Sequence, residues 1–139
     1  MKNIGVFCLL RRGDKIVLVK TKRKDLNWVL PGGAVNLKES LHEALLRELL
    51  EEVNFVPNNK PIFRCVFYSI EKYSLAFCYE LFLENNDLKN IQFGTVSNNE
   101  IGEVGLFDID YLPSLISKRT RIRIENVINN NVVYLFEYE

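Results

Sequence analysis

The chain has 139 residues, 47% of them hydrophobic, which suffices for one compact domain and is too short for two ordinary ones. Its 18 lysines and arginines balance 18 aspartates and glutamates, so net charge gives no sign of a nucleic-acid polymer or a membrane surface as partner. No apolar run approaches the roughly 20 residues of a transmembrane helix, and the N-terminus lacks the apolar core of a signal peptide. We expect a single domain over residues 1–139 and a cytoplasmic location.

Three cysteines, Cys8, Cys65 and Cys78, lie far apart in apolar, strand-like runs. An odd number of cysteines without a Cys-x-x-Cys spacing argues against both a disulfide framework and a zinc site. We therefore expect buried, reduced thiols.

The N-terminal part of the chain predicts a β-hairpin. Residues 3–12 and 15–20 are rich in apolar and β-branched side chains, and Gly13-Asp14 between them suits a tight turn. A short apolar segment at 28–30 then ends at Pro31-Gly32-Gly33. Proline stops a strand there, and the two glycines permit a backbone path that other residues resist.

A helix is predicted from Leu41 to Val53. Ser40 is a candidate N-cap, and Glu43 three residues later completes the pattern of a capping box. No glycine or proline interrupts the segment, which consists mainly of leucine, alanine and glutamate, all good helix formers. At roughly 100° per residue, one stripe of apolar side chains should face a core: Leu45, Leu46, Leu49, Leu50 and Val53.

The carboxylates of this helix are expected on a different side from the leucine stripe. Spacings of three and four residues stack side chains on one surface, which brings Glu48, Glu51 and Glu52 together. Like charges so placed destabilise a bare helix by roughly 0.2–0.5 kcal/mol per pair, and Arg47 is the only lysine or arginine in the segment. A hard divalent cation would stabilise such a cluster. The alternative is a solvated acidic surface without a ligand.

The rest of the chain predicts a second antiparallel strand pair, a polar loop, and a C-terminal helix and strand. The predicted segments are strands at 62–71 and 74–84 with a break near Lys72-Tyr73, a long polar loop up to Asn99 that begins at Asn85, a strand at 104–107, a turn or single helical turn within 108–115, an amphipathic helix at 118–128 and a strand at 132–136. Strands interrupted by two helices favour an α/β fold with a mixed sheet between helical layers.

The stretch from Gly33 to Phe55 resembles the Nudix box. In that signature a glycine is followed after five residues by glutamate, and after seven more by Arg-Glu-aliphatic-any-Glu-Glu-any-Gly-aliphatic. The matching positions are Gly33, Glu39, Arg47, Glu48, Leu49, Glu51, Glu52 and the apolar Phe55. Asn54 stands where the family has glycine. We expect it to end the helix in a left-handed conformation, because asparagine is the usual substitute for glycine there.

The resemblance implies a Nudix-type α/β/α sandwich with a mixed β-sheet. It also implies hydrolysis of a nucleoside diphosphate linked to a group X, releasing a nucleoside monophosphate, with Mg²⁺ or Mn²⁺ as cofactor and a small nucleotide as partner. Positioning and electrostatics carry such a reaction, so no Ser, Cys or His nucleophile is required. Dimers are common among proteins resembling this one, which leaves a homodimer open.

The same resemblance suggests roles for individual positions. The implied metal ligands are Glu48, Glu51, Glu52, Glu100 and the backbone of Gly33; the implied catalytic residues are Glu51, Glu52, Arg47 and Glu100; Glu39 and Gly32 would support the site. The choice of general base stays open among the glutamates. Glu103 is the rival of Glu100 as the extra carboxylate from outside the box.

The substrate is not predicted by the sequence. ADP-ribose, nucleoside triphosphates, dinucleotides and nucleotide sugars all fit the implied reaction. The aromatic residues that could stack on a base, but that strand spacing assigns to the core, are Phe7, Trp28, Phe67, Tyr68, Phe77 and Tyr79. The charged segment 21–25 is expected to be solvated surface, with contact to substrate phosphates as the alternative. His42, the single histidine, is expected at the surface rather than as a base.

Two other functions compete with hydrolysis. A non-catalytic Nudix-fold nucleotide sensor would normally have lost box carboxylates, and none is lost here. A purely structural acidic helix would leave Pro31-Gly32-Gly33 and Glu39 unexplained. We therefore favour the hypothesis that the protein is a catalyst of this hydrolysis.

Overall fold

The computed structural model describes residues 3–22, 27–96, 100–129 and 135–138. Its elements are β1 (Ile4–Arg12), β2 (Lys15–Thr21), β3 (Trp28–Val29), β4 (Gly32–Ala34), α1 (Leu41–Val53), β5 (Ile62–Ser69), β6 (Ser74–Phe82), α2 (Asn85–Asn90), β7 (Gly94–Thr95), β8 (Ile101–Asp108), α3 (Lys118–Ile128) and β9 (Leu135–Tyr138). None of the helices in this described part of the chain has the length and apolarity needed to cross a membrane.

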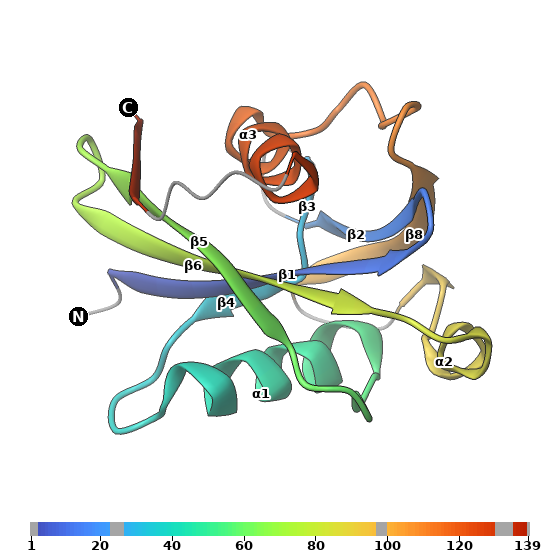
Figure 1. Cartoon of the computed structure of the whole chain (residues 1–139). Coiled ribbons are helices and arrows are strands. Elements are labelled where there is room, and N and C mark those ends of the chain that lie inside the picture. Colours follow the sequence, from blue (N-terminus) through green and yellow to red (C-terminus); the bar gives the residue numbers. More distant parts are fainter. Residues whose placement is uncertain (1–2, 23–26, 97–99, 130–134, 139) are drawn as a thin grey trace.

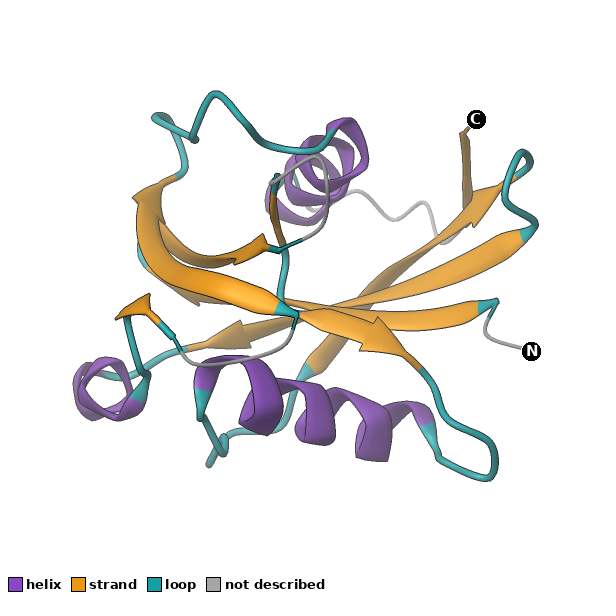
Figure 2. Cartoon of the chain, turned by 180° about the vertical axis from the view of Figure 1, so that it is seen from behind, coloured by secondary structure: helices purple, strands orange, loops and turns teal. Residues whose placement is uncertain are grey.

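The described strands form one mixed sheet between two helical layers. The strand order is β7-β8-β2-β1-β6-β5-β9, with β3 beside β2 and β4 beside β1. Two pairings, β1 with β6 and β5 with β9, are parallel, and the others are antiparallel. In Figures 1 and 2, α1 and α2 lie on one side of the sheet and α3 lies on the other. The predicted α/β/α sandwich is therefore confirmed.

Strands β1 and β2 are buried on both faces, which explains their nearly continuous apolar sequence. Alternate residues point to opposite faces, so each strand contributes to two cores. One core packs under α1 and includes Val6, Cys8, Leu10, Val17, Leu45 and Leu49. The other packs under α3 and includes Leu9, Ile16, Leu18, Cys65, Cys78 and Ile124.

Strand β1 has different neighbours along its two halves. Its C-terminal end pairs with β2, through Arg11 opposite Ile16. Its N-terminal half pairs instead with β4, where Gly5, Val6 and Phe7 lie opposite Ala34, Gly33 and Gly32 in turn. The glycine segment predicted as a turn is therefore a short strand, inserted beside β1.

A buried carboxylate ties three strands together. Glu80 on β6 is 1% exposed. Its Oε2 lies 3.1 Å from Arg11 Nη1 on β1, and its Oε1 accepts a hydrogen bond of 2.8 Å from Arg64 Nε on β5. A buried charge is costly unless it is paired and hydrogen-bonded, and these two arginines meet that condition.

The described part of the polar segment, residues 85–96, has more secondary structure than the sequence predicts. It contains α2 and β7. The Glu84 backbone N–H donates to Asp87 Oδ2 in a capping arrangement, and Ile91 is buried against the α1 core. The prediction of one long loop was wrong because it weighed overall polarity above local capping chemistry.

Other predicted segments agree with the structure to within a few residues. The strand predicted at 104–107 begins earlier, at Ile101. Residues 23–25 of the charged segment and residues 132–134 of the last predicted strand lie outside the described residues, whereas Leu135–Tyr138 form β9 beside β5.

Helix α1 begins and ends as predicted. Ser40 Oγ accepts a hydrogen bond from the Glu43 N–H, and the Glu43 side chain accepts one from the Ser40 N–H. Asn54 closes the helix with φ 56° and ψ 42°, a left-handed conformation, and its N–H donates to the Leu50 carbonyl.

The left-handed conformation of Asn54 predicts a graded response to substitution. Asn54→Ala should lower the free energy of unfolding by about 1 kcal/mol, because a β-carbon without a polar side chain is disfavoured in this region. Asn54→Gly should be close to neutral. Urea unfolding followed by circular dichroism measures both, and equal destabilisation by the two variants would contradict this account.

Candidate active site

The glycines of β4 allow the backbone to pass unusually close to β1. The Cys8 N–H donates to the Pro31 carbonyl at 3.0 Å. Gly32 has φ +149°, and a β-carbon there would overlap the Val6 carbonyl oxygen. Only glycine tolerates this approach. Its consequence is that the Gly32 N–H points at α1, where it donates to Glu52 Oε1 at 2.8 Å.

The second glycine makes room for another α1 carboxylate. A β-carbon built on Gly33 would lie 2.6 Å from Glu48 Oε1 and 2.8 Å from its Cδ. The carboxylate of Glu48 therefore occupies the space that a side chain at position 33 would need. Glycine at this position follows from packing as well as from backbone freedom.

Arg47 joins the acids of the box to the segment before the helix. Its Nε and Nη2 donate to the two oxygens of Glu39 at 2.7 and 3.0 Å, a bidentate pair. Its Nη1 donates to Glu48 at 3.0 Å and to Glu51 at 3.4 Å. Nη2 also donates to the Ala34 carbonyl at 2.9 Å. The predicted partnership of Arg47 with Glu39 is thus present in the structure.

Helix α1 presents its acids to the sheet more than the sequence analysis predicts. Glu48 and Glu52 are buried, whereas Leu50, assigned to the core stripe, is half exposed. The helix is turned about its axis because the Gly32 N–H and the space over Gly33 receive the two carboxylates. Periodicity alone could not reveal this rotation, since it depends on a strand distant in sequence.

Burial and like charge raise the pKa values of the two inward carboxylates. Loss of solvation raises the pKa of Glu52 to about 9, with contributions from the charges of Glu48, Glu100 and Glu51 and against the hydrogen bond from Gly32. Loss of solvation also raises the pKa of Glu48, against the opposing effect of Arg47. By contrast, the hydrogen bonds from Arg47 lower the pKa of Glu39 to about 2. Glu39 is thus held in its ionised form. Glu48 and Glu52, by contrast, lack a positively charged partner strong enough to offset their loss of solvation.

The structure brings Glu100 toward the cluster and directs Glu103 away. The charge of Glu100 contributes to the raised pKa values of both Glu48 and Glu52, and Glu103 makes no such contribution. Glu103 lies opposite Lys20 in the β2–β8 ladder, and Lys20 Nζ stands 5.9 Å from the ring centroid of Trp28, in the α3-side core. Cross-strand partners share a face, so Glu103 belongs to the far side of the sheet from α1.

Several remaining predictions concern single side chains. His42 is exposed in the first turn of α1, as predicted. Trp28 and Phe67 are buried in the α3-side core, and Phe7, Tyr68, Phe77 and Tyr79 are half-buried. The Asn36 N–H, which donates to Glu39 at 2.9 Å, was not predicted and carries no distinctive sequence signal.

The donor set fits a hard divalent cation. Mg²⁺ is generally held by one or two carboxylates, with waters and substrate phosphates completing its octahedron. Glu48 and Glu52 are two desolvated carboxylates whose charged forms require such a partner, and Glu51 and Glu100 add charge beside them. Among the residues that the structure describes, no three or more His, Cys, Asp or Glu side chains are grouped closely enough to hold a metal ion by themselves.

Comparison with known proteins shows which family the chain belongs to. The NUDIX domain profile matches residues 1–126. The chain belongs to the NUDIX domain family. This agrees with the box resemblance and with the arrangement of Arg47 and the glutamates around β4.

The individual proteins that the chain resembles share between about a quarter and two fifths of the aligned residues with it. The chain is 26% identical over 125 residues to the ADP-ribose pyrophosphatase of Methanocaldococcus jannaschii, covering 86% of this chain and 69% of that protein. It is 37% identical over 79 residues to the 8-oxo-dGTP diphosphatase of Buchnera aphidicola, covering 54% of this chain and 59% of that one. The crystal structure of a MutT NUDIX hydrolase from Burkholderia pseudomallei superposes with a TM-score of 0.77 at 26% identity, covering 91% and 98% of the two chains. The family match and these relatives together identify the chain as a Nudix-family pyrophosphohydrolase.

Substitution of Gly33 should separate activity from stability. Gly33→Ala places a methyl group against the Glu48 carboxylate, which can swing aside at small cost to the fold. Displacement of about 1 Å at such a site lowers kcat/KM by about 100-fold. Nucleotide hydrolysis assays and thermal melts of the purified variant measure both effects. A variant with unchanged activity would show that Glu48 does not need its present position.

The raised pKa of Glu52 predicts how the metal-free protein responds to pH. The folded state holds the proton up to about pH 9, whereas the unfolded state releases it near the ordinary pKa of about 4.3. This contribution to stability is therefore complete below the unfolded pKa and is lost as pH rises toward 9. Glu52→Gln cannot ionise, so in EDTA its Tm should gain on the wild type between pH 5 and pH 8. A Tm difference between Glu52→Gln and the wild type that stays constant over this pH range would contradict the raised pKa of Glu52.

Proposed function

We propose that this Nudix chain is a Mg²⁺- or Mn²⁺-dependent hydrolase of the pyrophosphate linkage in a nucleoside diphosphate linked to a group X, releasing a nucleoside monophosphate. The metal ligands would be Glu48, Glu51, Glu52, Glu100 and the backbone carbonyl of Gly33. A small nucleotide is the partner, and the cytoplasm is the proposed location. The observation that carries the proposal is the pair of desolvated carboxylates, Glu48 and Glu52, held over the β4 glycines.

The bound cation would neutralise the pyrophosphate and lower the pKa of a coordinated water. The chain supplies the positioning. The Gly32 N–H holds one oxygen of Glu52, which leaves the other for the ion. Arg47 fixes Glu48 through a hydrogen bond to its Oε1 and is itself fixed by Glu39. These contacts set the carboxylates before substrate arrives, so little reorganisation is required during the reaction.

Glu51 is the candidate for orienting or deprotonating the attacking water. Its side chain is 54% exposed, in contrast to those of Glu48 and Glu52, and it lies within 3.4 Å of Arg47 Nη1. An exposed carboxylate beside a metal can reach a solvent molecule. Glu100 is the alternative, because this residue immediately before β8 lies close enough for its charge to act on both Glu48 and Glu52.

Two relatives narrow the first substrates to be tried. One is an ADP-ribose pyrophosphatase and another is an 8-oxo-dGTP diphosphatase. Both substrates contain a phosphoanhydride between a nucleoside 5′-phosphate and a second group, which is the linkage that a carboxylate-bound cation would activate. We propose ADP-ribose as the leading candidate, because that relative aligns with 86% of this chain.

The purified protein should release monophosphate from at least one member of a panel containing ADP-ribose, 8-oxo-dGTP, a dinucleoside polyphosphate and a nucleotide sugar. Glu52→Gln should reduce kcat by more than about 100-fold, since loss of even a supporting residue costs a metal site about 10–100-fold. Its fold should be retained, because glutamine can accept the Gly32 hydrogen bond. Product release is measured by liquid chromatography in the presence of Mg²⁺, and again with EDTA.

Glu43→Gln is the matched control, an identical change on the same helix. Glutamine still serves as the capping partner of Ser40, so this variant should keep wild-type turnover. Near wild-type turnover in Glu52→Gln would remove Glu52 from the site. Binding of panel members and of Mg²⁺ without any product would instead support the nucleotide sensor.

A further inference from the structure

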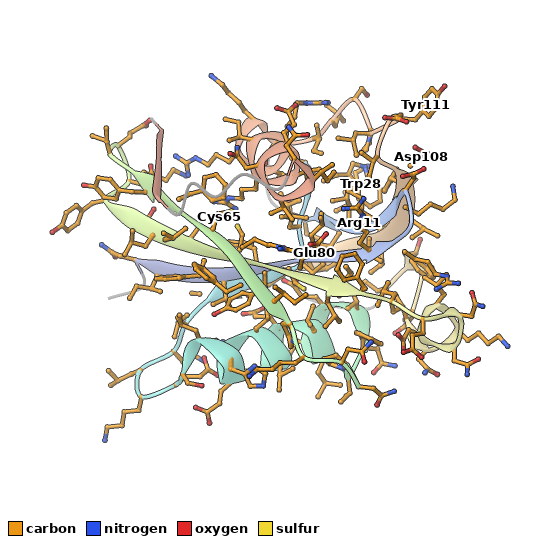
Figure 3. All side chains as sticks on the ribbon, viewed as in Figure 1. Arg11, Trp28, Cys65, Glu80, Asp108 and Tyr111 are labelled. Carbon is orange, nitrogen blue, oxygen red and sulfur yellow. The ribbon has the colours of Figure 1, made fainter. Side chains whose placement is uncertain are left out.

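Two of the three cysteines face each other across neighbouring strands. In the antiparallel β5–β6 ladder, Cys65 lies directly opposite Cys78. Both are buried in the α3-side core, so their side chains share one face of the sheet. In Figure 3, Cys65 lies on β5 at the side facing α3. Directly opposed antiparallel residues have Cα atoms about 4.5–5.5 Å apart, within the range of about 4.4–6.8 Å that disulfides span.

The two thiols are free and share one environment. Cys65 and Cys78 are 2% and 1% exposed, lie in the same core and occupy opposed positions of the β5–β6 ladder. The pair is therefore arranged as a dithiol, before any oxidation.

The surroundings of the two sulfurs differ. The neighbouring Cys78 thiol and the positive charge of Arg123 on α3 lower the pKa of Cys65, against the effect of burial. Burial and the neighbouring Cys65 raise the pKa of Cys78, although the charge of Arg123 acts on it in the opposite direction. Arg123 is held in place over the Phe7 ring, with its Cζ 4.4 Å from the ring centroid. Of the two, Cys65 is thus the better nucleophile, because the thiolate is the reactive form of cysteine.

We propose that Cys65 and Cys78 form an oxidisable dithiol, which low-molecular-weight disulfides such as glutathione disulfide convert to a cross-strand disulfide between β5 and β6. This modification site is separate from the carboxylate cluster, since it lies in the core on the opposite face of the sheet. It does not depend on the proposed function.

The reaction has two balanced steps. The Cys65 thiolate attacks the oxidant's S–S bond, forming a mixed disulfide and releasing one glutathione thiolate, which takes up the proton lost by Cys65. The Cys78 sulfur then attacks the Cys65 sulfur, giving up its proton and displacing the second glutathione thiolate. In total the protein loses two protons and two electrons, and glutathione disulfide gains them as two molecules of glutathione.

Cys8 cannot replace either member of the pair. It is fully buried in the core under α1, on the other face of the sheet. Burial and the charge of Glu80 raise the pKa of its thiol, so its thiolate is disfavoured. The chain therefore contains its own internal control.

Peptide mapping of the intact, folded chain tests the proposal. The protein is incubated to equilibrium with glutathione disulfide, alkylated with iodoacetamide and digested with trypsin. Lys72 separates the two cysteines, so the disulfide would join the peptide of residues 65–72 to that of residues 73–89. We expect this linked pair, with an intact mass reduced by two hydrogen atoms. Dithiothreitol should reverse the change.

Variants and an unfolded sample decide the remaining outcomes. Cys8→Ser should retain the linked peptides, whereas Cys65→Ala and Cys78→Ala should lose them. The wild-type map is decisive even if a core variant folds poorly. A link through Cys8, a stable glutathione adduct on Cys65, or oxidation only after unfolding in urea would each overturn the proposal.

Discussion

The guanidinium of Arg47 is the interaction on which the site depends. It contacts Glu39, Glu48 and Glu51, together with the Ala34 carbonyl, and so links the loop before α1, the helix itself and the end of β4. A lysine could supply the charge but not the fork of donors that satisfies several acceptors at fixed angles. The acids of the box are thus arranged as neighbours of one planar cation, which holds their positions but does not neutralise them all.

That incomplete neutralisation is what makes the site chemically useful. Glu52 receives one backbone hydrogen bond and forms no salt bridge with the described residues, in a place where solvation is poor. Its carboxyl group therefore favours the protonated form, and a divalent cation would stabilise the ionised form instead. The close approach of Gly32 to β1 and the lack of a side chain at Gly33 permit this burial, so backbone sterics and the proposed metal affinity are two aspects of one arrangement.

Much of this could be predicted from local sequence, and the exceptions share a cause. The capping box at Ser40, the left-handed Asn54 and the hairpin strands depend on nearby residues, and the sequence predicts them. The rotation of α1, the insertion of β4 beside β1 and the ion pairs of Glu80 depend on contacts between distant segments. No periodicity or motif encodes such contacts. The choice of Glu100 over Glu103 likewise required the strand register, which decides the face of each side chain.

The divided pairing of β1 has a consequence for cooperativity. This one strand supports the glycines of the site through Val6 and Phe7, and it reaches the Glu80 ion pairs through Arg11. The site and the Glu80 ion pairs are therefore attached to the same strand, which is paired along its length with β6. Amide hydrogens along β1 should exchange only through the global transition. A spectroscopic probe at either end of β1 should then report the loosening of the glycine segment and the unfolding of the sheet as a single transition.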